Sequence, residues 1–290
     1  MSRFAALAGH RAVRRQLPAA PRQPAERDEN VMQPFLVTGG TGKLGRAVVR
    51  RLHDGHREIR VLSRRAQPPG TPASHRHVVG DLRTGQGLDA ALRGVGTVVH
   101  CATTYGKEDI TTTRNLIDAA LRSGSNPHLV YVSIVGVDVI PVPYYRHKLA
   151  AERMIARSGL PWTVQRATQF HDLVASFFAW QRWFPLTLTL QRFRFQPIDV
   201  RDVADRLARL AVSDPAGRAP DIGGPRVCAM RDLATAHNEA HGLRRRVVSL
   251  RVPGRIARGF TEGANLVPHH AIGTVTFDDF LVEQREDNGT

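Results

Sequence analysis

The length and composition of the chain predict a folded globular protein, because 290 residues with 42% hydrophobic content can bury a sizeable core in one large α/β domain or two small ones. The formal net charge of +15 would suit a polyanionic partner, but the basic residues are nearly all arginines scattered without a basic block, and no nucleic-acid-binding motif accompanies them. Compositional bias explains this charge better than a nucleic-acid face, so we expect no nucleic-acid partner.

Cysteine usage and hydrophobicity indicate a soluble protein of a reducing compartment. Cys101 and Cys228 lie in different segments and form no C-x-x-C or histidine-rich ligand pattern, so the sequence predicts no metal site. The most apolar long stretch, residues 173–190, is interrupted by Arg182 and Pro185 and therefore does not predict a membrane span. We expect a soluble, cytoplasmic protein without a membrane partner.

The first 31 residues differ from the rest of the chain, because they carry six arginines and three prolines with little periodic apolar pattern. They predict a disordered basic tail that takes no part in the fold. A transit peptide is one alternative, and an over-extended start with Met32 as the first translated residue is another.

From residue 34 onward, short apolar runs alternate with helical patterns in a repeated β-α-β order. Unbroken apolar runs suit strands that are buried on both faces, and the intervening helices provide the crossovers of a parallel sheet. The strand-like runs are residues 35–37, 59–62, 78–79, 95–100, 129–132 and 162–164, and the helical patterns are residues 44–52, 110–121 and 149–155. We therefore predict the α/β class with a doubly wound parallel sheet.

Beyond residue 168 the alternation loosens into a strand-like run at 193–198, a helical pattern at 200–210 and mixed α/β material. We predict a core domain over residues 32–168 and a small C-terminal α/β lobe on the substrate side over residues 169–290, integrated with the core. The aromatic series from Phe170 to Trp183 predicts a buried amphipathic helix, with a cover over an apolar substrate as the alternative.

A glycine-rich turn lies directly between the first predicted strand and the first predicted helix, which is the context of a dinucleotide-binding fingerprint. Gly39 would permit the tight turn, Gly42 would let backbone amides approach a pyrophosphate, and Gly45 would let the helix pack on the sheet. The helix N-terminus adds partial positive charge for the phosphates. We therefore predict a Rossmann-type domain rather than an ordinary glycine turn, with cofactor contacts from Gly39, Thr41, Gly42, Lys43, Leu44 and Gly45.

The end of the second predicted strand bears on the choice of cofactor. An NAD site presents an acidic residue to the ribose 2′-hydroxyl at this point. Here the strand ends in Ser63-Arg64-Arg65, and the two arginines could bind a 2′-phosphate instead. Chance placement is the alternative in so arginine-rich a chain. The sequence therefore predicts NADP(H) as the preferred cofactor, with NAD(H) possible.

Three motifs together resemble the atypical short-chain dehydrogenase/reductase family, especially its NmrA-like branch, over roughly residues 35–224. They are the turn at residues 38–45, the run Gly80-Asp81-Leu82, and the run His100-Cys101-Ala102-Thr103. The resemblance implies that Asp81 and Leu82 contact the adenine and that the backbone of Cys101, Ala102 and Thr103 lies beside the ribose next to the nicotinamide. It also implies that residues 166–172 leave the sheet toward the substrate region. Considered alone, Asp81 would be a turn residue or helix cap.

Tyr144 and Lys148 form a Tyr-x-x-x-Lys motif at the start of a predicted helix, which places both side chains on one face. With Ser133 at the end of the preceding strand, they match the family's Ser/Tyr/Lys triad. In a reductase, Tyr144 would donate a proton to the substrate oxygen and Lys148 would bind ribose hydroxyls and lower the tyrosine pKa. Ser133 would hydrogen-bond the same oxygen. A turn serine, an amphipathic tyrosine and a solvated lysine are the structural alternatives. The family's fourth catalytic residue is an asparagine, and the sequence gives no firm match of Asn115 to it.

These motifs predict an NADP(H)-dependent oxidoreductase that transfers a hydride between nicotinamide and a small carbonyl or alcohol substrate. The alternative is an NmrA-like redox sensor that binds NAD(P) without turnover and acts through a protein partner. A sugar-nucleotide epimerase is less favoured, because the acid after the second strand is missing. A homodimer is possible in each case.

Overall fold

The computed structural model describes residues 33–53, 57–66 and 75–288. The predicted tail, residues 1–31, lies outside this part of the chain. By their backbone contacts, all of the described residues belong to one compact unit.

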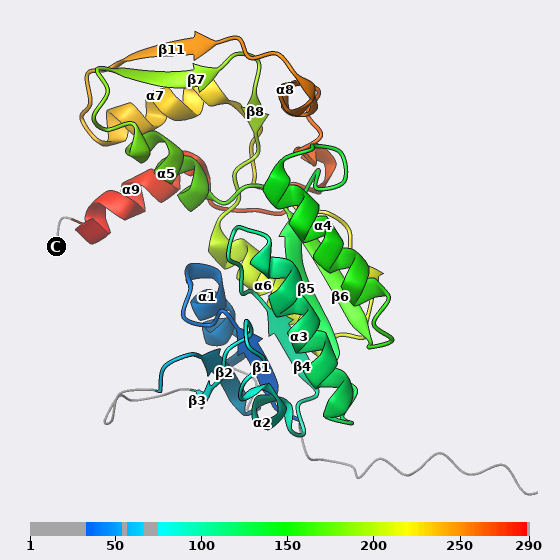
Figure 1. Ribbon diagram of the computed structural model, residues 1–290. Helices are drawn as coiled ribbons and strands as arrows, with labels where there is room; N and C mark the ends of the chain where they lie inside the picture. Colours follow the sequence, from blue (N-terminus) through cyan, green and yellow to red (C-terminus); the bar gives the residue numbers. More distant parts are fainter. Residues whose placement is uncertain (1–32, 54–56, 67–74, 289–290) are drawn as a thin grey trace, which may run out of the picture. The chain divides into compact units, whose positions relative to one another are not determined.

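A seven-stranded parallel sheet forms the centre of this unit, with strand order β3-β2-β1-β4-β5-β6-β9 (Figure 1). The strands predicted between residues 35 and 164 are all present in it, so the predicted α/β doubly wound class is confirmed. The strand-like run at 193–198 is not part of it, because only Arg194–Phe195 form a strand there, in a separate two-stranded sheet. The strands are β1 (Phe35–Thr38), β2 (Ile59–Ser63), β3 (Arg76–Val79), β4 (Thr97–His100), β5 (His128–Ile134), β6 (Trp162–Ala167) and β9 (Gly217–Arg218).

Helices cover both faces of the sheet, because alternate residues of each buried strand point to opposite sides. Val37 packs in one apolar cluster with α1 and α6, whereas its neighbour Leu36 packs in a second with α2, α3 and α4. The helices are α1 (Lys43–Leu52), α2 (Leu88–Leu92), α3 (Glu108–Arg122), α4 (Pro143–Ala156) and α6 (Val200–Val212). All but α2 correspond to helical patterns in the sequence.

The strand register brings the ends of the central strands to one level. Thr38 of β1 pairs with Leu62 of β2 on one side and with His100 of β4 on the other, and His100 pairs with Tyr131 of β5. The chain order of the strands reverses between β1 and β4, which is where open α/β sheets bind their ligands.

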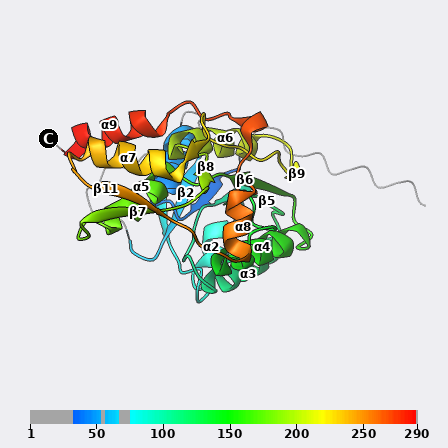
Figure 2. The same ribbon diagram turned by 90° about the horizontal axis from the view of Figure 1, so that it is seen from above.

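The remaining elements form a lobe with its own apolar core, built around Phe178, Leu233 and Leu281. Two small two-stranded sheets, β10-β8 and β11-β7, belong to it, and α7 contacts α9, beside which it lies in Figure 2. Its elements are α5 (His171–Trp180), β7 (Leu186–Leu190), β8 (Arg194–Phe195), β10 (Cys228–Ala229), α7 (Met230–Ala240), β11 (Arg246–Leu250), α8 (Arg255–Thr261), a 3-10 turn (Pro268–His270) and α9 (Phe277–Asn288).

Two features of residues 169–290 differ from the sequence-based expectation. The chain returns to the core sheet after α5, since α6 packs on α1 and β9 pairs with β6. The interpretation of the aromatic series as a buried helix is wrong for most of its residues: Phe178 is 2% exposed, but Trp180 is 72% and Trp183 80% exposed. Within the described ranges, no helix is long and apolar enough to span a bilayer.

Candidate functional site

The glycine turn between β1 and α1 is packed so closely that side chains are excluded from it. Gly39 has φ +69°, and a Cβ built on it would lie 2.6 Å from the backbone nitrogen of Ala102. A Cβ on Gly45 would lie 2.2 Å from the carbonyl oxygen of Gly39. The missing side chain of Gly45 therefore lets the first turn of α1 pack closely on the glycine turn where the chain leaves β1, and its expected role in packing the helix on the sheet stays a prediction.

The N-terminus of α1 is open toward this turn. Gly42 is the N-cap residue and no side chain caps the helix, so the first amides of α1 have no side-chain acceptor in the described structure. A bend free of Cβ atoms, followed by uncapped helix amides, fits the diphosphate of a dinucleotide. The residues of the turn therefore fit a bound NAD(P)(H).

The other predicted residues of the turn have individual surroundings. Thr41 is exposed, and its carbonyl oxygen accepts a hydrogen bond from Arg46 Nη1 at 2.9 Å, which closes the turn. The Lys43 ammonium forms an ion pair with Asp172 at the start of α5. The Leu44 side chain is buried in the core, so only its backbone can face a cofactor.

Arg64 and Arg65 follow the last residue of β2 and are exposed. The Arg65 amide donates to Ser63 Oγ at 3.2 Å, which turns the chain at the strand end. Neither guanidinium forms an ion pair with a described residue. Both are therefore free to bind an anion at the edge where a 2′-phosphate would lie.

The loop after β3 uses the side chain of Asp81 to hold its own shape. Asp81 Oδ1 accepts from the Arg83 amide at 2.8 Å, and the Leu82 side chain is buried in the core. Asn115 Nδ2 donates to the carbonyl oxygens of Leu82 at 2.8 Å and Arg83 at 3.0 Å. Asn115 therefore fixes this loop and makes no hydrogen bond to the Tyr144 region.

The segment after β4 passes beside the glycine turn. The Cys101 amide donates to the Thr38 carbonyl at 3.1 Å, and Ala102 faces Gly39. Burial raises the pKa of the Cys101 thiol to about 12, so this cysteine stays protonated and is no nucleophile. Thr103 lies next in the chain, and its hydroxyl contacts Tyr144 at 2.9 Å.

Tyr144 lies at the start of α4 with its hydroxyl on Thr103 and its ring 5.5 Å from that of Tyr105. Burial raises the pKa of Tyr144, and the nearby Asp109 carboxylate acts in the same direction. The pKa of Tyr144 therefore lies above its ordinary value in this structure, and the lowering expected from Lys148 stays a prediction.

Lys148 is buried one helical turn along α4. Its Nζ donates to the Val132 carbonyl at 2.8 Å and lies 4.1 Å from the centroid of the Tyr131 ring. Burial lowers the pKa of Lys148 to about 8. Ser133 Oγ, on the adjoining strand residue, is buried without a hydrogen-bond partner. The triad residues thus lie on β5 and α4 as expected, but no described hydrogen bond joins Tyr144 to Lys148 or Ser133.

Two residues of this region were missed by the sequence analysis. Asp109 in α3 is 2% exposed and accepts hydrogen bonds from Thr103 and Thr104. His100 bonds Thr38 Oγ1 at 2.6 Å through Nδ1, and burial lowers the pKa of this histidine to about 3. Asp109 carried no distinguishing signal, because an acidic residue in the first turn of a helix is common.

Residues at the end of β6 and just after it bind α4 and the loop before it through side-chain contacts. Arg166 binds both carboxylate oxygens of Glu152 on α4 at 2.8 and 2.7 Å, and Asp138 at 2.8 Å. Gln169 Nε2 donates to Tyr145 OH at 3.2 Å. His171 begins α5 and bonds the Val275 carbonyl at 3.0 Å.

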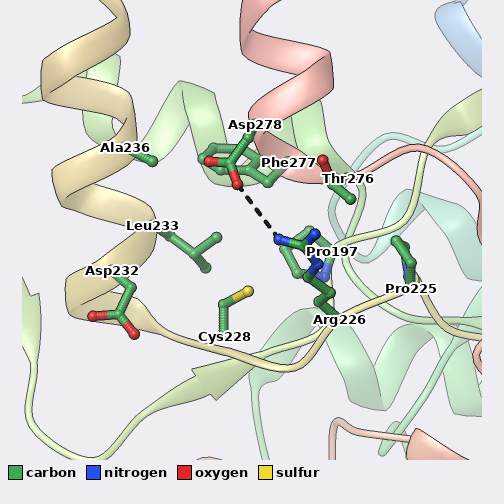
Figure 3. A pocket seen from close by; sticks show the side chains of 10 residues that line it. All are labelled: Pro197, Pro225, Arg226, Cys228, Asp232, Leu233, Ala236, Thr276, Phe277 and Asp278. Carbon is green, nitrogen blue, oxygen red and sulfur yellow. Dashed lines mark ion pairs between the residues drawn. The ribbon is translucent and has the colours of Figure 1, made fainter.

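A small hollow elsewhere in the lobe is not part of this site. It has a volume of about 70 Å³, and Arg226 and Asp278 approach to 3.9 Å across it (Figure 3). Cys228 lines it, and burial raises the pKa of that thiol. None of the predicted site residues lines this hollow.

Comparison with known sequences gives one family match and several relatives. A family described as NAD(P)H-binding matches residues 39–211. The (4-alkanoyl-5-oxo-2,5-dihydrofuran-3-yl)methyl phosphate reductase of Streptomyces griseus is 30% identical over 68% of this chain and 70% of that protein. An NAD(P)H azoreductase of Xenophilus azovorans is 28% identical over 74% of this chain and 77% of that protein.

The first relatives found are much longer proteins. An uncharacterized protein of Mycobacterium tuberculosis is 28% identical over 63% of this chain but only 19% of its own length. The chain thus spans about a fifth of the first curated relatives that it matches.

Solved structures show the same fold. An NADPH-dependent quinone oxidoreductase from Escherichia coli, complexed with NADPH, has a TM-score of 0.73 with 18% identity, covering 87% of this chain and 99% of that chain. A triphenylmethane reductase of Citrobacter sp. complexed with NADP(H) has a TM-score of 0.64 with 18% identity, covering 86% and 94%.

Proposed function

Because the chain belongs to the NAD(P)H-binding family of atypical short-chain dehydrogenase/reductases, we propose that it is an NADP(H)-dependent oxidoreductase acting on a small carbonyl or alcohol substrate. The family binds NAD(P)(H), and two of its relatives are named as reductases. The reaction would be the transfer of a hydride between nicotinamide C4 and the substrate carbon.

The observation that carries this proposal is the packing of the glycine turn. Gly39 and Gly45 leave no room for a Cβ, and α1 starts behind them without a side-chain cap. Gly39, Gly42 and the first amides of α1 would hold the diphosphate. Arg64 and Arg65, both exposed at the end of β2, would hold a 2′-phosphate and so favour NADP(H) over NAD(H).

The bound cofactor would supply the hydride, and the protein would supply orientation and proton handling. Tyr144 would exchange a proton with the substrate oxygen, which the unpartnered Ser133 Oγ could also bind. Lys148 would bind the ribose hydroxyls, for which its ammonium keeps two unused donors after bonding Val132.

One observation favours a second candidate, the non-catalytic NAD(P)-binding regulator. The Tyr144 hydroxyl is hydrogen-bonded to Thr103 and the Lys148 ammonium to a strand carbonyl, and no hydrogen bond of the described structure joins the triad. A protein that senses the cofactor needs only the glycine turn. It would act through a protein partner.

Turnover measurements with single variants distinguish these candidates. NADPH oxidation would be followed with a probe panel of an aromatic aldehyde, a cyclic enone, a naphthoquinone and an azo dye. Tyr144→Phe should lower kcat by about 10²-fold or more at unchanged NADPH Kd, the range for a lost general acid. Tyr105→Phe is the matched control, since this tyrosine is 70% exposed beside Tyr144.

Two results would count against the oxidoreductase proposal. Equal turnover by wild type and Tyr144→Phe would remove the tyrosine from the reaction. Tight NADPH binding by wild type with no turnover of any probe would favour the regulator.

A further inference from the structure

A line of hydrogen bonds leads from the Tyr144 hydroxyl into the protein interior. Tyr144 OH lies 2.9 Å from Thr103 Oγ1, and Thr103 Oγ1 donates to Asp109 Oδ2 at 2.8 Å. The backbone amide of Tyr105 donates to the same Thr103 oxygen at 3.3 Å. The three side chains come from α4, the segment after β4, and α3.

Elementary chemistry fixes the direction of this line. A carboxylate can only accept hydrogen bonds, and a threonine hydroxyl has one hydrogen and two lone pairs. The single hydrogen of Thr103 therefore goes to Asp109, and its lone pairs accept from Tyr105 N–H and from Tyr144. It follows that the Tyr144 hydrogen points at Thr103, and not toward a substrate.

Asp109 is a fixed end of the line. Its side chain is 2% exposed, and Oδ1 accepts from the amide and the hydroxyl of Thr104 at 2.6 and 2.7 Å. The residue lies in the first turn of α3, where the helix dipole favours a negative charge. Thr104 shares this carboxylate with Thr103 but makes no described contact with Tyr144.

We propose that Thr103 and Asp109 are positioning residues that relay the proton of Tyr144, an inference that rests on the function proposed above. In alcohol oxidation, the substrate O–H bond breaks and its proton joins the Tyr144 oxygen. Tyr144 passes its own proton to Thr103, and Thr103 passes its proton to Asp109, while the hydride carries two electrons to the oxidised nicotinamide. In carbonyl reduction each transfer is reversed: Asp109 first takes up a proton from water, and the two hydroxyl groups turn so that Thr103 donates to Tyr144 and Tyr144 donates to the substrate oxygen.

The first test needs no turnover. In protein labelled with ¹³Cζ-tyrosine and free of substrate, proton NMR should show a slowly exchanging hydroxyl proton that disappears in Tyr144→Phe and has a nuclear Overhauser effect to the Thr103 methyl group. Thr103→Val should bring this proton into fast exchange with water, whereas Thr104→Val should not. Equal exchange rates in wild type and Thr103→Val would overturn the proposal.

The second test uses the probe that wild type turns over fastest. Thr103→Val should lower kcat by about 10²-fold, the low end of the range for lost proton transfer, with NADPH Kd unchanged. Thr103→Ser should restore kcat to within about 3-fold of wild type, because the hydroxyl is regained. Rates in H₂O–D₂O mixtures should give a curved dependence in wild type and a straight one in Thr103→Val.

Thr104→Val is the matched control for loop folding around Asp109. Equal losses of kcat in Thr103→Val and Thr104→Val would mean that Asp109 only shapes the loop, and would overturn the relay. An unchanged kcat in Thr103→Val would also overturn the relay while leaving the oxidoreductase proposal intact. If wild type turned over no probe, both the oxidoreductase proposal and the proposed proton transfer through Thr103 to Asp109 would be overturned.

Discussion

Burial decides the charge of the side chains around Tyr144. His100 is neutral at physiological pH because burial lowers its pKa to about 3, and the Cys101 thiol stays protonated because burial raises its pKa to about 12. Lys148, with a pKa of about 8, is the cation among these three at neutral pH. Of these three side chains, Lys148 therefore offers a positive charge to a cofactor. Its ammonium lies between the Val132 carbonyl oxygen and the Tyr131 ring.

The lowered pKa of Lys148 predicts a pH dependence of stability. The folded pKa of about 8 lies below the value of about 10.4 for an unfolded lysine, so the unfolded chain binds more protons between these two pH values. The contribution of Lys148 to the free energy of unfolding should therefore rise with pH over this window, by at most about 1.4 kcal/mol per pH unit. The raised pKa of the Cys101 thiol acts in the opposite direction in wild type and variant alike, so the two are compared by their difference. Lys148→Met should lack this rise.

Urea unfolding of wild type and Lys148→Met at several pH values from 7.5 to about 10 measures this difference. Lys107→Met is the matched control, because this lysine is exposed at the N-cap of α3. The same pH increment in wild type and Lys148→Met would contradict the assignment.

The glycine turn gives a second prediction for a single residue. Gly45→Ala places a methyl group 2.2 Å from the Gly39 carbonyl oxygen, so the turn must open. Overpacking of about 1–3 kcal/mol at the cofactor turn should weaken NADPH binding by about 10-fold or more. Gly106→Ala, whose new Cβ meets no atom closer than 3.9 Å, serves as control. Fluorescence titration with NADPH that gave equal Kd values for both variants would refute the packing argument.

The sequence could predict the site residues that belong to local motifs, but not those that join the site through contacts made in the fold. Tyr144, Lys148 and the glycines carry spacing or conformational constraints that are local in the chain. Asp109 and His100 became part of the site only through contacts with Thr103 and Thr38, 6 and 62 residues away. Such contacts depend on how loops pack across the sheet, which periodicity does not encode.

At the level of elements, Arg166 joins β6, α4 and the loop between β5 and α4. It binds Glu152 through two nitrogens and Asp138 through the third, and its side chain is 5% exposed. Glu152 lies one helical turn beyond Lys148. The arginine therefore holds the helix that carries both Tyr144 and Lys148 against the sheet.

Loss of this arginine should be costly. Arg166→Met leaves the Glu152 carboxylate buried without its partner, so the free energy of unfolding should fall by about 3–5 kcal/mol. The double variant Arg166→Met with Glu152→Gln should recover part of this loss, since the buried charge is then removed.

Denaturant unfolding at pH 7 measures the effect. Arg218→Met is the control, because Arg218 is 40% exposed in its pair with Asp221, and exposed pairs contribute about 1 kcal/mol or less. Equal losses in Arg166→Met and Arg218→Met would show that the buried pair does not anchor α4.

For the molecule as a whole, the sequence predicted the core far better than the lobe. Buried parallel strands such as residues 129–132 are continuous apolar runs, and these identified the alternation of strands and helices along the chain. In the lobe, β8 and β10 have only two residues each, and Trp180 and Trp183 are exposed, so apolar residues do not mark buried positions. The packing of α6 on α1 and the pairing of β9 with β6 depend on tertiary contacts, which no local sequence pattern indicates.

The expected preference for NADP(H) depends on how two strands are placed, because β2 ends beside the glycine turn that follows β1. The double variant Arg64→Ala with Arg65→Ala should weaken NADPH binding by about 10- to 100-fold, the range for lost charged hydrogen bonds, and leave NADH binding unchanged. Arg93→Ala, on the exposed end of α2, is a control for net charge. An equal loss of both nucleotides would mean that the pair does not contact a 2′-phosphate.

The central claim is that the β1–α1 turn binds the diphosphate of a pyridine dinucleotide. Isothermal titration calorimetry of the folded wild-type chain with NADPH and with NADH tests it most directly. The account predicts saturable binding of NADPH that is tighter than binding of NADH. Absence of binding heat with both nucleotides, at concentrations up to the millimolar range and at more than one temperature, would contradict it.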